Sequence, residues 1–210
     1  MSSIVEITKI NSNNESTRLR LLDMTANPIE KMAYVARISH RSHETSKRTD
    51  IELLKDIIRW GHLSVFEHAY ASIEISGVSR ACTHQLVRHR HFSVMQESQR
   101  YVKPNGTVPV TPETILDNEK SLGIYDKFME QSFNTYNQLL SLGIPKEDAR
   151  MVLTNATPTK LVLTGNFRTW REFIHKRDIK AAQEEIRALA CEIREILSAA
   201  TAPFLWKYEI

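Results

Sequence analysis

The chain has 210 residues, which fits a single domain over 1–210, and 41% of them are hydrophobic, enough to bury a core. A net charge of +3 suits anionic small molecules and is weak support for binding nucleic acid. No apolar run is long enough to span a membrane, the N-terminus lacks the pattern of a signal peptide, and the two cysteines form no CxxC pair. We therefore expect a cytoplasmic protein with reduced thiols and no membrane partner.

The first half of the chain predicts helices and one strand. Residues 11–17 are polar and predict a turn. Residues 27–38 predict a helix, because proline is tolerated at the first helical position. A capping-box sequence opens a second helix over 49–61, which ends at a glycine. Apolar and polar residues alternate over 69–76, which predicts a strand, and a serine cap begins a short helix over 79–89.

The second half is richer in helix. We expect a long amphipathic helix over 113–142 and a shorter one over 145–154. Residues 160–164 predict a buried strand, and 166–176 predict another helix. The last helix is expected over 178–200, before a proline that prevents its continuation.

The order of these elements predicts the fold class. It is a helix-rich α+β (mixed α/β) fold with a small central sheet flanked by long helices. Helical spacing places Ile124 and Phe128 on the core face of the long helix, and Ile179 on that of the last helix. Arg80 and Arg171 are expected on solvated helix faces.

One segment near the middle of the chain is the strongest functional signal. Arg88-His89-Arg90 is followed by seven residues and then Ser98, and the stretch from Gln96 to Arg100 is almost entirely polar. Such a loop predicts a ligand, because the arginine fork binds phosphate or carboxylate at two points. The chain has neither a GxGxxG nor a GxxxxGK[ST] motif, so side chains would have to hold a nucleotide.

The spacing Arg-His-Arg-x7-Ser resembles the signature of the flavin-dependent thymidylate synthases, the ThyX family. Four further blocks occur in the family's order and extend the resemblance over about residues 30–190. Trp60–His68 is similar to the GHxSxxEH segment and 149–153 to AR-x-x-LP. Residues 166–168 match N-x-R, and Arg177 with 182–186 matches R-x4-AQ-x-EI.

The resemblance implies a site for dUMP. Arg177 would be the catalytic residue, because it favours uracil ionised at N3 and so makes C5 nucleophilic. The residues implied to bind dUMP are Gln85, Arg88, Gln96, Glu97, Ser98, Gln99, Arg100, Arg150 and Arg177.

The resemblance also implies tightly bound FAD. The residues implied to hold it are Ser39, His62, Ser64, Glu67, Arg88, His89, Arg90, His91, Gln96, Asn166, Arg168 and Glu172.

The family's reaction uses no nucleophile from the protein. NADPH would reduce the flavin, methylenetetrahydrofolate would supply the carbon, and tetrahydrofolate would be released. The family is homotetrameric, with active sites shared between subunits. No metal is expected, because no cysteine or carboxylate cluster completes a zinc set with His40 and His43.

Four positions depart from the family's common pattern. Gln96 stands where many members have glutamate, and a neutral amide can donate hydrogen bonds but cannot take up a proton. Thr154 replaces a proline, Glu172 stands where asparagine is frequent, and Ala181 stands where histidine is frequent.

Three other interpretations assign the signature segment a different role. The basic run with Phe92 and Tyr101 could bind phosphate and stack a base in a nucleic-acid-binding module. A protein that binds flavin or nucleotide without thymidylate chemistry is a second alternative. A basic loop that pairs with glutamates of a neighbouring subunit is a third.

Overall fold

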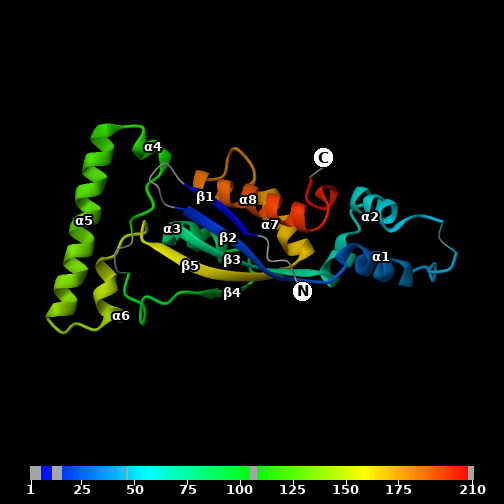
Figure 1. The fold of residues 1–210 in the computed structure, drawn as a ribbon, viewed down its shortest axis with the longest axis horizontal. Coiled ribbons are helices and arrows are strands. Elements are labelled where there is room, and N and C mark those ends of the chain that lie inside the picture. The colour runs from blue at the N-terminus through cyan, green and yellow to red at the C-terminus, as the bar shows by residue number, and fades with distance from the viewer. Residues whose placement is uncertain (1–5, 11–15, 46, 105–107, 208–210) are drawn as a thin grey trace.

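An antiparallel β-sheet forms the centre of the molecule (Figure 1). The computed structural model describes residues 6–10, 16–45, 47–104 and 108–207. Within these ranges the strands pair in the order β1-β2-β3-β5-β4, and every neighbouring pair is antiparallel. The strands are β1 (Glu6–Ile10), β2 (Ser16–Met24), β3 (Tyr70–Ser79), β4 (Ser93–Gln96) and β5 (Pro158–Asn166).

The two central strands follow the alternation that the sequence predicts. On β3, Ala71, Ile73 and Ile75 are fully buried, while the polar residues between them are only half-buried. Successive side chains of a strand point to opposite faces, so one face of β3 lies in the core. β5 repeats the pattern with Leu161 and Leu163. Both predicted strands are confirmed, and both continue past their expected C-terminal ends.

The sequence interpretation misses β1, β2 and β4. β2 carries a period-2 signal, because buried Leu19 and Leu21 alternate with Arg18 and Arg20. The turn predicted over 11–17 lies mostly outside the described residues, and its last two residues belong to β2. β4 is an edge strand too short to show a periodic pattern.

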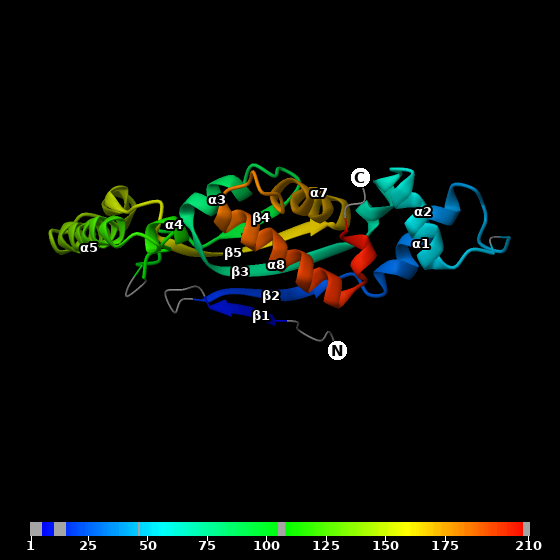
Figure 2. The same ribbon diagram turned by 90° about the horizontal axis from the view of Figure 1, so that it is seen from above.

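Helices cover one face of the sheet (Figure 2). α7 (Phe167–Arg177) packs on β5, α8 (Glu184–Ala200) on β1 and β2, and α3 (Arg80–Leu86) between β3 and α8. Trp170 and Phe173 of α7 are fully buried, as the sequence predicts. The Trp170 indole also donates a hydrogen bond to the carbonyl of Ala71 at 3.1 Å, which connects α7 to the start of β3.

The last helix begins later than the sequence predicts. Residues 178–183 form a turn, and α8 starts after Gln183, whose side chain accepts a hydrogen bond from the Ile186 N–H at 3.4 Å. Two glutamates follow in the first helical turn, where negative charge is favourable. Ile179 therefore lies outside the helix and is 45% exposed, so its predicted core position is wrong.

The end of the chain packs back on α7. The short helix η3 (Pro203–Leu205) lies against α8, and Arg171 donates hydrogen bonds to the carbonyls of Leu205 and Lys207. Arg171 is buried, so its predicted place on a solvated face is wrong. Among the described residues, no helix combines the length and apolarity that crossing a membrane requires.

One end of the sheet carries α1 (Pro28–Ile38), α2 (Asp50–Arg59) and η1 (Leu63–His68) (Figure 1). The predicted capping box is present, because the Thr49 hydroxyl accepts from the Glu52 N–H and the Glu52 carboxylate accepts from the Thr49 N–H. Gly61 has φ of 72°, a conformation that glycine adopts without strain and that ends the helix.

The other end carries α4 (Glu113–Leu116), α5 (Glu119–Ser141), α6 (Lys146–Ala149) and η2 (Arg150–Val152). The predicted helix over 113–142 is interrupted, because the Asn118 side chain caps α5 by accepting from the Ser121 N–H at 3.1 Å. α5 stands at the edge of the molecule (Figure 1), where Ile124 is 74% and Phe128 58% exposed. Neither side chain therefore lies in the core of this chain, so the predicted core positions are wrong.

Candidate substrate and cofactor site

Hydrogen bonds of Gln96 connect the polar loop, Gln96 to Arg100, to α3 and β5. It is the last residue of β4, and its Nε2 donates to the hydroxyls of Thr83 on α3 at 3.1 Å and Thr159 on β5 at 3.3 Å. The Glu97 N–H then donates to the carbonyl of Lys160 at 2.8 Å. An amide can donate both of these hydrogen bonds, whereas a carboxylate cannot. The two bonds therefore explain why glutamine is present at position 96, where glutamate is common in the family that the sequence resembles.

The next residues form a turn that is cross-linked to α6. The Arg100 N–H donates to the Ser98 hydroxyl at 3.3 Å, and the Arg100 guanidinium pairs with Glu147 at 2.9 Å. Arg150 donates from Nε to the carbonyl of the same Glu147 at 3.0 Å. Gln99 is half-buried beside this turn. The structure thus brings two predicted anion-binding arginines, Arg100 and Arg150, to one short helix.

Arg80 joins this cluster, although the sequence interpretation places it on a solvated face. It is half-buried at the start of α3. Burial and the nearby Arg150 guanidinium lower the pKa of Arg80, while the Glu97 carboxylate raises it. Like charges brought together in a partly desolvated place are typical of an anion site. The only local pattern at this position is the helix-capping serine before Arg80, and it does not predict that Arg80 lies near Arg150.

The rest of the signature lies between α3 and β4. Gln85 is near the start of α8, since its Nε2 lies 3.4 Å from the Gln183 Oε1. Arg88, Arg90 and His91 are exposed, so they are free to reach a ligand or another chain. His89 alone turns inward.

His89 meets Arg177, the last residue of α7. The Arg177 Nε–H donates to the His89 Nε2 at 3.0 Å, and the His89 ring packs edge-on against Phe173 with centroids 5.0 Å apart. The pKa of His89 is lowered to about 4, mainly by burial and also by the charges of Arg177 and Lys176, against the opposing effect of Glu172. His89 is therefore neutral at physiological pH and acts as an acceptor.

A second group of predicted residues meets at the opposite end of α7. Arg168 donates to Glu67 of η1 at 2.6 Å and to Glu172, one turn along α7, at 3.3 Å. The hydrogen bond that Arg168 donates to Glu67 is the main reason that the pKa of Arg168 is raised. Asn166 caps α7 by accepting from the Thr169 N–H at 2.9 Å. The structure therefore brings Glu67, Arg168 and Glu172 into direct contact.

A cavity of about 980 Å³ lies between α1, α2 and η1. Ser39, His62 and Ser64, all predicted cofactor residues, line it, together with Arg37 and Arg48. None of the residues predicted to bind dUMP lines this cavity.

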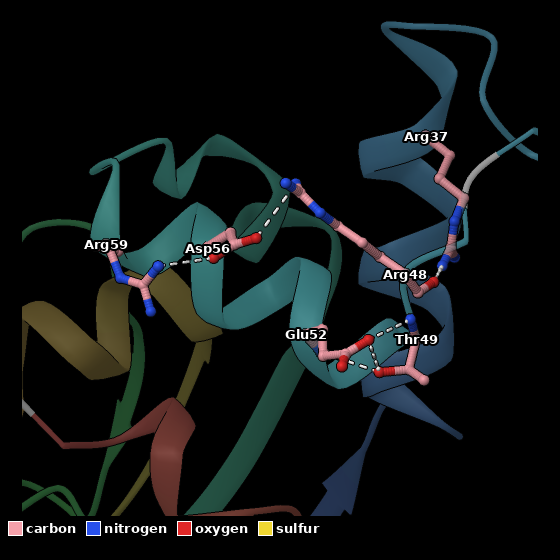
Figure 3. Close-up of polar contacts among 6 residues, drawn as sticks. All are labelled: Arg37, Arg48, Thr49, Glu52, Asp56 and Arg59. Atoms are coloured by element: carbon pink, nitrogen blue, oxygen red, sulfur yellow. Dashed lines mark hydrogen bonds and ion pairs between the residues drawn. The ribbon is translucent and has the colours of Figure 1, made fainter.

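Ion pairs hold the cationic rim of this cavity in place (Figure 3). Asp56 pairs with Arg48 at 3.2 Å and with Arg59 at 3.0 Å, and Arg37 donates to the Arg48 carbonyl at 3.0 Å. The Arg48 guanidinium also lies 5.5 Å above the Trp60 ring. A wide cavity with a flat aromatic ring and fixed cations fits a large, planar, anionic cofactor.

A smaller cavity of about 110 Å³ lies beside the start of α8 and has the opposite charge. Glu113, Glu184 and Glu185 line it. A hydrogen bond with Glu113 raises the pKa of Glu184, and Glu185 accepts from the Ser79 N–H and hydroxyl at 2.6 Å each. Its carboxylates would repel phosphate, so this cavity does not suit a nucleotide.

Comparison with known proteins decides the family. The sequence profile described as "Thymidylate synthase complementing protein" matches residues 20–203. A flavin-dependent thymidylate synthase of Mycobacterium sp. (strain JLS) is 42% identical over 177 residues, which cover 74% of this chain and 69% of that protein. One from Geobacter sulfurreducens (strain ATCC 51573 / DSM 12127 / PCA) is 37% identical over 199 residues, covering 90% of this chain and 85% of that protein.

The chain belongs to the flavin-dependent thymidylate synthase family. The resemblance drawn from the signature is confirmed, and so is the α+β fold. In this synthase the two groups of predicted residues lie toward different ends of the sheet, with α7 between them (Figure 1). Arg168 and Glu172 lie toward the cavity end of α7, and Arg177 lies at the loop end.

Proposed function

We propose that this synthase methylates dUMP to dTMP, with methylenetetrahydrofolate as carbon donor and NADPH as reductant. One dUMP, one methylenetetrahydrofolate, one NADPH and one proton would give dTMP, tetrahydrofolate and NADP⁺. The observation that carries the proposal is Arg177, which the signature histidine fixes at the end of the helix joining the loop to the cavity. FAD would take hydride from NADPH and return it to complete the methyl group.

The polar loop and its neighbours would bind dUMP. The phosphate needs two or more cations once it leaves water, and Arg80, Arg100 and Arg150 converge around Glu97 and Glu147. Ser98 and Gln99 lie in the same turn, Gln85 lies in the last turn of α3, and Arg88 follows that helix. Arg80 is an addition to the residues that the family signature suggests.

Arg177 would act on the uracil ring. A guanidinium beside N3 and a neighbouring carbonyl oxygen stabilises the ionised ring, which raises the electron density at C5. Cys82 does not suit the role of nucleophile, because it is fully buried and burial raises its pKa.

The cavity between α1, α2 and η1 would hold FAD. His62, Ser64 and Ser39 line it, and Asn166, Arg168, Glu67 and Glu172 lie on the neighbouring face of α7 and η1. Arg88, His89, Arg90, His91 and Gln96, which the signature also assigns to FAD, lie on the loop side instead. We propose that one active site combines the two sets from neighbouring chains.

We therefore also propose a homotetramer with active sites shared between subunits, built from one domain per chain over 1–210. The exposed apolar residues of α5, Ile124 and Phe128, support burial against another subunit, since large apolar side chains rarely group on a free surface. A cytoplasmic location agrees with the free thiols of Cys82 and Cys191.

Arg80→Ala tests the added phosphate contact. We expect KM for dUMP to rise about 10-fold or more, because a charge-assisted hydrogen bond contributes about 1.5–3 kcal/mol, while kcat changes little. Steady-state kinetics with varied dUMP measure both. Arg20→Ala, which removes a half-buried arginine paired with Glu74 on the sheet, is the matched control and should leave KM unchanged. An unchanged KM in Arg80→Ala would remove Arg80 from the site.

The visible absorption spectrum of the purified protein, with and without dUMP, tests the proposed ligands. We expect a flavin band that shifts or sharpens as dUMP binds beside it. A colourless protein that takes up no added FAD and binds oligonucleotides in a salt-dependent way would favour the nucleic-acid reading instead.

A further inference from the structure

His89 occupies a place that the flavin role of the signature does not explain. Its Nε2 accepts from the Arg177 Nε–H at 3.0 Å, and its ring lies edge-on against Phe173, which is one helical turn before Arg177 on α7. The imidazole therefore contacts α7 at two successive turns of one face. This face of α7 ends at Arg177, and the proposed function assigns the chemical step to the Arg177 guanidinium.

The main chain and the core hold His89 in this position. The His89 N–H donates to the Leu86 carbonyl at 3.0 Å, and the His89 carbonyl accepts from the Phe92 N–H at 3.3 Å. Phe92 is itself buried, with its ring 4.4 Å from that of Trp170. A side chain supported in this way can orient another group, because its own freedom is already restricted.

The hydrogen bond also assigns the tautomer of His89. An Nε2 that accepts carries no hydrogen, so the neutral ring bears its hydrogen on Nδ1. On Arg177 the bond occupies Nε alone. Within the described residues the two terminal nitrogens of Arg177 make no hydrogen bond or ion pair, so they remain able to grip a planar ligand at two points.

We propose that His89 is a positioning residue for Arg177: its Nε2 holds the Arg177 Nε–H and so orients the terminal nitrogens of the guanidinium toward the uracil ring. This inference rests on the proposed role of Arg177 in dUMP methylation. It makes the middle residue of Arg-His-Arg part of the substrate site, not of the flavin site alone. Neutral His89 is maintained by burial and by the positive charges of Arg177 and Lys176, against Glu172.

Three variants in the FAD-loaded protein separate this role from others. His89→Ala removes the acceptor, and His89→Gln keeps an oxygen that can accept from the Arg177 Nε–H. His84→Gln changes an exposed histidine of α3 and is the matched control. We measure the dUMP dissociation constant by calorimetry, the FAD content, and the ¹³C shifts of the uracil C2 and C4 carbons in bound labelled dUMP, which report ionisation at N3.

The expected result is a rise of about 10-fold or more in the dUMP dissociation constant of His89→Ala, with loss of the N3-ionised signal. His89→Gln should stay within about threefold of the wild type, since a hydrogen bond replaced in kind changes affinity little. In a background of Arg177→Ala, His89→Ala should add nothing, because contacting residues that act through one group are not additive. His84→Gln should match the wild type throughout.

Two results would overturn the inference. One is that His89→Ala keeps normal dUMP affinity and the ionised signal; the other is that Gln and Ala are equally damaging. The Arg177 Nε–H proton resonance, protected from exchange by its acceptor, tests the contact without substrate: we expect it in the wild type and in His89→Gln but not in His89→Ala. A wild type that shows this resonance but does not bind dUMP would contradict the proposed function and leave the contact standing.

Discussion

Arg177→Ala is expected to lower dTMP formation at saturating dUMP by about 1000-fold or more. Removing one preorganised donor to a developing charge costs enzymes about 10²–10³-fold in kcat, and Arg177 supplies a full charge as well as donors. Ground-state binding of dUMP should weaken too, because the guanidinium contacts the ring before reaction. Rapid-mixing measurements at saturating dUMP separate the chemical step from binding.

Arg177→Lys is the informative companion to this variant. Lysine keeps the positive charge but lacks the planar fork and the Nε–H that His89 accepts. We expect its rate to fall between those of Arg177→Ala and the wild type. Near-normal turnover in Arg177→Ala would refute the catalytic assignment, whatever the behaviour of the lysine variant.

Gly165→Ala is expected to destabilise the protein by about 1–3 kcal/mol, the usual cost of overpacking a core. Gly165 lies in β5 opposite Ala71, and a Cβ placed on it would meet two ring carbons of Phe92 at 2.6 Å. Phe92 is buried against Trp170 and cannot swing into solvent without leaving its site. Because Phe92 follows the Arg-His-Arg run and its N–H donates to the His89 carbonyl at 3.3 Å, catalysis should fall as well.

Urea denaturation at fixed protein concentration measures this loss of stability. Gly123→Ala is the matched control, since nothing lies within 4 Å of its added Cβ in α5. We expect it to raise the free energy of unfolding by up to about 1 kcal/mol, because alanine has the higher helix propensity. A second change, Phe92→Leu, should restore part of the stability of Gly165→Ala. Full stability of Gly165→Ala alone would show that Phe92 does not fill this space.

Local signals in the sequence predict much of the fold. The capping box of Thr49 and Glu52, the glycine stop at Gly61 and the alternation on β3 each act over a few residues, and all are found in the structure. The start of α8 is missed because 178–183 has helical composition, whereas the Gln183 cap fixes the boundary six residues later than expected.

Features set by distant contacts are not predictable in this way. Ile124 and Phe128 have core spacing, but α5 extends past the body of the chain, so both side chains are exposed. Arg171 looks like a surface residue until the C-terminal segment folds over it. In both cases the sequence shows the helical spacing of the side chains, but only the tertiary structure decides whether another segment covers that face of the helix.

The candidate site also combines features that local sequence predicts with features that depend on distant contacts. The signature identifies the loop, and the family blocks identify Arg150 and Arg177, yet neither shows that Arg80 approaches Arg150 or that His89 accepts from Arg177. These pairs are 70 and 88 residues apart in the chain, and no local spacing encodes them. Gln96 is a further case, because its two threonine contacts come from α3 and β5.

The most direct test of the account is the product balance of the reaction. The purified protein is supplied with FAD, NADPH, methylenetetrahydrofolate and dUMP tritiated at C5, and released tritium, dTMP and the oxidation state of the folate are measured together. We predict one tritium released and one tetrahydrofolate formed for each dTMP. A flavin-loaded protein that binds dUMP but releases no tritium, or one that yields dihydrofolate, would contradict it.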